Sequence, residues 1–130
     1  MGGYPNGSQR RTALGRYGED VACAFLTERG YRIVERNWRC REGELDIVAL
    51  DADFLVGCEV KTRSSNAYGS PEEAVTPRKV VRLRKLLALW LAGRTPGSLA
   101  CRPVELRLDV VAVELSPKGP AVVRHLLGVG

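Results

Sequence analysis

The sequence has few of the residues that build zinc sites, disulfide frameworks or membrane spans. His125 is the only histidine, and the longest apolar run, Leu86 to Ala92, is too short to cross a bilayer. No apolar segment of the kind found in signal peptides occurs near Met1. The four cysteines show no C-x-x-C spacing, which argues against structural zinc: Cys23, Cys40, Cys58 and Cys101. We therefore expect a cytoplasmic protein without membrane association, with reduced and mostly buried cysteines.

Length and composition predict one ordinary globular domain. The chain has 130 residues, of which 45% are hydrophobic and 27% charged, and a chain of this size buries a substantial core. Residues 1–11 are rich in Gly, Asn and Ser, and we predict that they form a disordered tail. Residues 12–130 then form a single domain.

Acidic residues are missing from one long segment of the sequence. The net charge is +5, and no acid occurs between Glu73 and Glu105. Seven basic residues lie in that segment: Arg78, Lys79, Arg82, Arg84, Lys85, Arg94 and Arg102. A basic region beside an acidic pocket suits a polyanion bound near a metal. A solvated helix face is the plainer alternative, and the charge pattern alone favours it.

Hydrophobic periodicity predicts an α/β fold with the order α-β-β-β-α-β and a further edge strand at the end. The expected elements are a helix over 12–30, strands over 31–39, 43–51, 54–61, 104–113 and 121–127, and a helix over 77–92. Thr76 is the predicted N-cap of the second helix, and Pro77 its first residue. This helix has a basic stripe of Arg78, Arg82 and Lys85, opposite an apolar one of Val80, Leu83, Leu87 and Leu91. It can bury one side and present the other to phosphates.

Four charged residues recur with strand spacing in the hairpin. Glu44 and Asp46 are two residues apart, as are Glu59 and Lys61, so each pair shares one strand face. A two- or four-residue loop around residues 51–53 would place Asp46 opposite Glu59, with Cβ atoms about 4.5–5.5 Å apart. Carboxylates so close repel each other unless a cation or a proton lies between them.

These residue types are those that metal-dependent phosphodiester hydrolysis uses. Mg²⁺ prefers oxygen ligands and is usually held by one or two carboxylates with water and phosphate. Asp46 and Glu59 fit as ligands, with the Val60 carbonyl as a third. Lys61 would lie beside the attacking water or the phosphate, as a positive charge or as a proton acceptor.

A surface salt-bridge ladder is the alternative interpretation of the same hairpin. It would join Lys61 to Glu44 and Asp46 to Arg63, and each pair would contribute about 0–1 kcal/mol.

Several motifs resemble the YraN-type family of small bacterial proteins, over roughly residues 12–113. They are Gly15-x-x-Gly18-Glu19, Arg36-Asn37, Gly43-Glu44-Leu45-Asp46, Glu59-Val60-Lys61-Thr62-Arg63, Pro71-Glu72-Glu73-Ala74-Val75 and Lys79. That family is similar to archaeal Holliday-junction resolvases of the PD-(D/E)xK nuclease superfamily, although Leu45 stands where the superfamily signature has proline. The resemblance implies a restriction-endonuclease-like three-layer fold, with a central mixed β-sheet flanked by helices.

The same resemblance implies a metal-dependent nuclease centre. Its core would be Asp46, Glu59 and Lys61, and Glu19 would add an acid from the first helix as a further metal ligand. Glu44 matches a family residue and is a candidate accessory residue. Mg²⁺ is the expected cofactor, and Mn²⁺ can substitute for it.

The leading hypothesis is therefore an endonuclease that cleaves branched or otherwise structured DNA. Symmetric cleavage of a junction needs two active sites, so we expect a homodimer. The predicted DNA contacts are Thr62, Arg63, Arg78, Arg82 and Lys85, together with the 64–71 loop. Arg107 and Asp109 share one strand face, where a salt bridge is the favoured interpretation and substrate contact the second.

Two other function classes remain open from the sequence. One is a non-catalytic nucleic-acid-binding module on a nuclease-like fold, and the other is a protein-interaction adaptor. The acid–acid–lysine set favours the enzyme, because a binding module has no need of carboxylates that face a phosphate.

Overall fold

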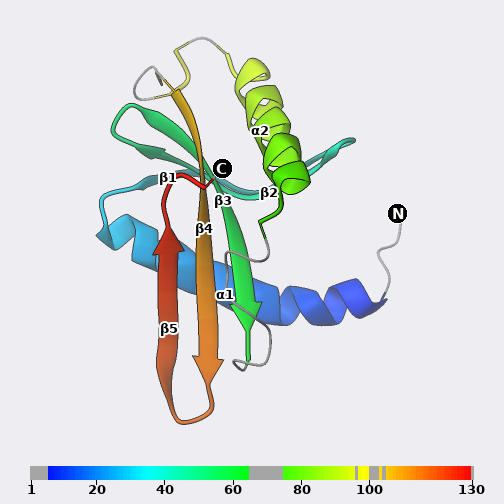
Figure 1. The fold of residues 1–130 in the computed structure, drawn as a ribbon, viewed down its shortest axis with the longest axis vertical. Helices are drawn as coiled ribbons and strands as arrows, with labels where there is room; N and C mark the ends of the chain where they lie inside the picture. The colour runs from blue at the N-terminus through cyan, green and yellow to red at the C-terminus, as the bar shows by residue number, and fades with distance from the viewer. Residues whose placement is uncertain (1–5, 65–74, 96, 100–102, 104, 130) are drawn as a thin grey trace.

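The computed structural model describes residues 6–64, 75–95, 97–99, 103 and 105–129 (Figure 1). Its elements are α1 (Asn6–Glu28), β1 (Arg32–Cys40), β2 (Gly43–Asp51), β3 (Phe54–Arg63), α2 (Pro77–Ala92), β4 (Glu105–Ser116) and β5 (Gly119–Leu126). The predicted α/β order is confirmed, including the final edge strand. Most of the predicted DNA-gripping loop, as well as Cys101 and Arg102, lies outside the described residues. Neither described helix is long and apolar enough to cross a membrane.

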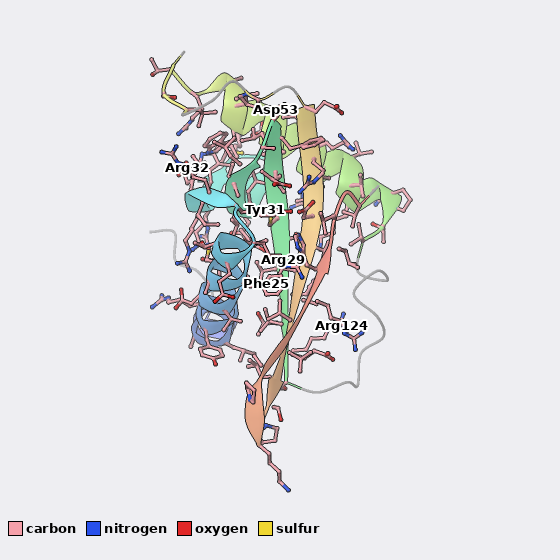
Figure 2. The ribbon with its side chains drawn as sticks, turned by 90° about the vertical axis from the view of Figure 1, so that its left-hand side faces the viewer. Phe25, Arg29, Tyr31, Arg32, Asp53 and Arg124 are labelled. Atoms are coloured by element: carbon pink, nitrogen blue, oxygen red, sulfur yellow. The ribbon has the colours of Figure 1, made fainter. Side chains whose placement is uncertain are left out.

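One mixed sheet forms the centre of the fold. Its strand order is β1-β2-β3-β4-β5; β3 and β4 are parallel, and the other neighbouring strands are antiparallel. Helix α1 lies on one face of the sheet and α2 on the other (Figure 2). Each helix covers its own apolar core, with Ile47 and Cys58 under α1 and Leu55 and Leu108 under α2. The expected three layers are present.

The β2–β3 hairpin has the two-residue loop that the sequence allowed. Asp51 pairs with Phe54, and Ala52 adopts a left-handed backbone conformation with φ of 52°. The pairing of the two strands continues as far as Ile47 and Cys58. This register decides where the charged residues beyond that pair lie.

Helix α2 has the predicted bounds and the predicted cap. The Thr76 hydroxyl accepts a hydrogen bond from the Lys79 backbone N–H at 3.2 Å, and this satisfies a donor that the first helical turn leaves free. The predicted basic stripe of Arg78, Arg82 and Lys85 is exposed. The fully buried side of the helix consists of Leu83, Leu86, Leu87 and Trp90, so the prediction missed two of its members.

Helix α1 begins earlier than predicted. It starts at Asn6 rather than at Thr12, so residues 6–11 are helical where we expected a disordered tail. The composition of this segment suggested disorder, but Gln9, Arg10 and Arg11 have high intrinsic helix propensity, and asparagine is favoured at helix starts.

Helix α1 packs on β3 through a glycine. A Cβ atom added to Gly18 would lie only 1.9 Å from the Thr62 hydroxyl oxygen and 2.8 Å from the Thr62 Cβ, whereas one added to Gly15 would meet nothing within 4 Å. Of the two glycines in this motif, only Gly18 is closely packed. This contact holds the middle of α1, including Glu19, against β3.

The two glycines provide a matched pair of substitutions. Gly18→Ala should destabilise the protein by about 1–3 kcal/mol, because Thr62 or the helix must move. Gly15→Ala should be neutral or stabilise it by up to about 1 kcal/mol, since alanine is the better helix former and has open space. Denaturant unfolding of both variants measures the difference. Equal stabilities would show that the helix does not approach β3 this closely.

Candidate metal and phosphate site

Asp46 and Glu59 lie directly beyond the last paired residues of the β2–β3 hairpin. Ile47 and Cys58 pair with each other, and both belong to the core under α1. Alternation does not assign a face to Asp46, because Leu45 and Val48 belong to the core under α2 whereas Ile47 belongs to the core under α1. From Cys58, alternation places Glu59 on the face that α2 covers. A salt bridge from Glu59 to Lys79 of α2 agrees with this placement. That the carboxylates of Asp46 and Glu59 share one face of the sheet stays a prediction.

The Asp46 side chain reaches across to the neighbouring strand. Its Oδ2 accepts a hydrogen bond from the Val60 backbone N–H at 2.9 Å. Burial and, to a smaller extent, the charges of Glu59, Glu19 and Glu44 together raise the pKa of Asp46 to about 7, although the Val60 hydrogen bond opposes the shift. Negative charge is thus concentrated around a carboxyl group that has little access to water.

Two lysines approach the same oxygen of Glu59. The Lys79 Nζ lies 2.5 Å from Glu59 Oε2, and the Lys61 Nζ lies 3.9 Å from it. The sequence predicted Lys61 beside the acids. It gave no role to Lys79 here, although it placed Lys79 in the basic segment, because no local pattern connects the start of α2 to a residue of β3.

Glu19 lies on α1, and two residues of β1 hold its carboxylate in place. Its Oε1 accepts hydrogen bonds from Arg36 Nε at 3.0 Å and from Asn37 Nδ2 at 2.8 Å. Asn37 has a φ of 55°, an uncommon conformation that asparagine tolerates better than most residues. The adjacent Arg36 and Asn37 thereby both reach Glu19. This contact gives a structural basis for the predicted Arg36-Asn37 motif.

The donor set fits a hard divalent cation held by two carboxylates. Asp46 and Glu59 supply the oxygen ligands that Mg²⁺ prefers, and the charge around Asp46 is the kind that a cation neutralises. Within the described part of the chain, no group of three His, Cys, Asp or Glu residues is already arranged to hold a metal. A Mg²⁺ ion here would complete its coordination with water and substrate oxygens.

Other residues that the sequence assigned to DNA contact or to an accessory role lie in different places. Thr62 lies under α1 at Gly18, and the Arg82 side chain lies beside Gly43 at the start of β2. Glu44 forms an exposed ion pair with Arg39 at 3.0 Å. Glu44 therefore pairs with a residue of β1. The alternative salt-bridge ladder would have paired it with Lys61.

Arg107 and Asp109 form the salt bridge that the sequence favoured, within a larger buried network. Asp109 is only 1% exposed and accepts hydrogen bonds from Arg107 Nε at 2.9 Å, Tyr31 Oη at 2.9 Å and the Gly128 N–H at 3.0 Å. His125 Nε2 lies 2.8 Å from its Oδ2. Burial would raise the pKa of Asp109, but the hydrogen bonds from these groups outweigh it and hold that pKa well below its ordinary value.

His125 had no predicted role because the sequence around it carries no motif. Its side chain is buried between Asp109 and the rings of Phe25 and Tyr31. Figure 2 shows Phe25 and Tyr31 on the α1 side of the sheet, where this network lies. The network joins Tyr31, which directly precedes β1, to β4, β5 and the segment that follows β5.

Comparisons with known proteins identify the family. Residues 18–113 match the model of the uncharacterised protein family UPF0102. A UPF0102 protein of Kineococcus radiotolerans is 54% identical over 119 residues, covering 92% of this chain and 94% of the relative. Those of Beutenbergia cavernae and Frankia alni are 52% and 51% identical, covering 92% and 91% of this chain and 98% and 94% of their own lengths.

Proposed function

Since the chain belongs to the uncharacterised protein family UPF0102, whose name assigns no activity, we propose a function from the site itself: a Mg²⁺-dependent endonuclease that cleaves structured DNA. One observation carries this proposal, namely that Asp46 accepts a hydrogen bond from Val60, the residue between Glu59 and Lys61, and that the Lys61 ammonium lies beside Glu59. Two carboxylates can hold the metal that hydrolysis of a phosphodiester uses, and a lysine beside them can act on the phosphate or the attacking water. The resemblance of the motifs to PD-(D/E)xK nucleases supports the same reaction.

Each residue of the site would have a distinct task. Asp46 and Glu59 would hold Mg²⁺, which when bound activates water and neutralises the phosphate. Lys61 would stand beside the attacking water or the phosphate, and would hold or accept a proton at Nζ. Glu19, fixed by Arg36 and Asn37, would add negative charge that favours a cation near Asp46.

The exposed face of α2 is the proposed DNA contact. Arg78, Arg82 and Lys85 are exposed along that helix, and such a row of cations binds the phosphate backbone without reading sequence. A homodimer would present two such sites to the two symmetric strands of a junction.

The test is nicking of a synthetic four-way junction with Mg²⁺ or Mn²⁺. Asp46→Ala and Lys61→Ala should each reduce the rate by about 100-fold or more, because each removes a group that acts in the transition state. The matched control is Lys118→Ala, which removes an exposed lysine of the β4–β5 turn. Equal rates in the wild type and in all variants would mean a contaminating nuclease.

A non-catalytic nucleic-acid-binding module is the second candidate, and the close Lys79–Glu59 ion pair favours it. If the protein is such a module, neither the wild type nor any variant should cleave DNA in a metal-dependent way. Arg82→Ala would weaken DNA binding with a reduced salt dependence, whereas Glu59→Ala would not weaken it.

A further inference from the structure

Lys79 occupies an unusual place for a cation. It lies in the first turn of α2, where its own N–H is held by the Thr76 cap, and that turn contains no acidic residue. The positive end of a helix dipole disfavours cations and favours anions such as carboxylates and phosphates. A lysine in this turn therefore has the most favourable electrostatic energy when its ammonium group binds an anion.

The anion that Lys79 now binds is a predicted metal ligand. Its Nζ lies 2.5 Å from Glu59 Oε2, whereas Lys61 lies 3.9 Å from the same atom. The Glu59 side chain is only 16% exposed and that of Lys79 is 33% exposed, so solvent screens this pair less than a fully exposed one. A divalent cation and Lys79 would compete for one carboxylate oxygen.

We propose that Lys79 is a substrate-positioning residue that changes partners: it binds Glu59 in the metal-free protein, and binds a DNA phosphate once a divalent cation has taken Glu59. This inference rests on the proposed function. Lys79 already lies next to the exposed Arg78 at the start of α2, so its released ammonium group joins a helix terminus that attracts phosphate.

Two consequences follow from this exchange of partners. In the absence of DNA, removing the Lys79 charge should strengthen metal binding, since Glu59 is then free. In the presence of DNA, metal and DNA should promote each other's binding, because each stabilises the arrangement that the other needs. Loss of Lys79 should weaken that mutual effect.

The first experiment measures Mn²⁺ affinity without DNA, by electron paramagnetic resonance. Lys79→Met should bind Mn²⁺ roughly fivefold more tightly than the wild type, the size expected for an ion pair of this exposure. Lys85→Met is the matched control: it removes the same charge from the same helix, and it should change Mn²⁺ affinity by less than about twofold. Unchanged or weaker Mn²⁺ binding by Lys79→Met would overturn the proposal, as would equal gains in the two variants.

The second experiment measures affinity for a four-way junction with and without Ca²⁺, a hard cation with the same preference for oxygen ligands. The gain in DNA affinity on adding Ca²⁺ should be roughly fivefold smaller in Lys79→Met than in the wild type. Lys85→Met should bind DNA more weakly overall and keep the wild-type gain. An undiminished gain in Lys79→Met would overturn the proposal.

The two proposals fail in different ways. Metal-dependent nicking by the wild type, together with unchanged Mn²⁺ affinity in Lys79→Met, would refute the exchange of partners and leave the nuclease standing. Tighter Mn²⁺ binding by Lys79→Met and a reduced Ca²⁺ effect on DNA binding, without nicking by any variant, would support the exchange and refute the nuclease.

Discussion

At pH 8, Asp46→Asn should make the protein more stable than the wild type, by about 1–3 kcal/mol. Burial and neighbouring acids raise the pKa of Asp46 to about 7, so the ionised carboxylate destabilises the native state at this pH. Asparagine removes that charge, and its side-chain oxygen can still accept the hydrogen bond from Val60. Most substitutions of partly buried polar residues instead lower the stability of a protein.

The dependence on pH follows from the direction of the Asp46 shift. The native carboxyl group has a higher pKa than the unfolded one, whose value is about 3.9, so the native state binds more protons between about pH 4 and pH 7. Wild-type stability therefore falls as the pH rises through this range, and the loss is complete above about pH 7. The advantage of Asp46→Asn should shrink below pH 7 and nearly vanish at pH 4.

Chemical denaturation of both proteins between pH 4 and pH 8 measures this effect. Asp53→Asn makes the same chemical change at an exposed carboxylate in the hairpin loop, and it should alter stability by less than about 0.5 kcal/mol. Lower stability of Asp46→Asn at pH 8 would contradict the account. Added Mn²⁺ should stabilise the wild type and have little effect on Asp46→Asn, because ligands stabilise only the states that bind them.

Asp109→Ala should have the largest destabilising effect, about 3–5 kcal/mol. The substitution leaves the partly buried Arg107 cation with only its ion pair to Asp51 and removes the acceptor that Tyr31, His125 and Gly128 share. Breaking a buried pair by removing one partner carries this cost because the other partner stays buried and uncompensated. Total stabilities of single domains are only about 5–15 kcal/mol, so the variant should be close to unfolding at 37 °C.

Glu114→Ala is the matched control for Asp109→Ala. Glu114 lies on the same strand, and its ion pair with Arg124, at 3.7 Å, has an exposed arginine, so its loss should cost less than about 1 kcal/mol. Thermal and chemical unfolding compare the two variants. Similar losses in both would mean that the Asp109 network does not fasten the end of the chain to β1 and β4.

The contribution of Asp109 to the stability of the fold should be lost only at strongly acidic pH. Hydrogen bonds hold the pKa of Asp109 below its unfolded value, so the stabilisation is present above about pH 4 and is lost as the pH falls through the lower native pKa. The Asp46 and Asp109 contributions thus have opposite signs with respect to pH.

The hairpin was predictable because its information is local. Alternation assigns a face to each residue, and a loop of fixed length then sets which residues face each other. The two-residue loop found at Ala52 and Asp53 therefore sets the register as far as the pair of Ile47 and Cys58, as the sequence indicated, and Asp46 and Glu59 follow directly beyond that pair. Helix α2 was equally predictable, since its cap and its first proline are adjacent in the sequence.

The contacts that join distant segments were not predictable from local patterns. Lys79 meets Glu59 from another element, and His125 joins Asp109 only after β5 has paired with β4. Such contacts depend on how helices and strands pack together. The φ of Asn37, which lets β1 hold Glu19 through two adjacent side chains, likewise has no signature in the sequence beyond the residue type.

The central claim is that Asp46 and Glu59 together hold a divalent cation, and anomalous scattering from crystals soaked in Mn²⁺ tests it most directly. The account predicts one Mn²⁺ peak between these two carboxylates, with Lys79 moved away from Glu59 and the rest of the coordination made by water. A fully soaked crystal without a peak at this position, in which Lys79 still binds Glu59 and Asp46 still accepts only from Val60, would contradict it.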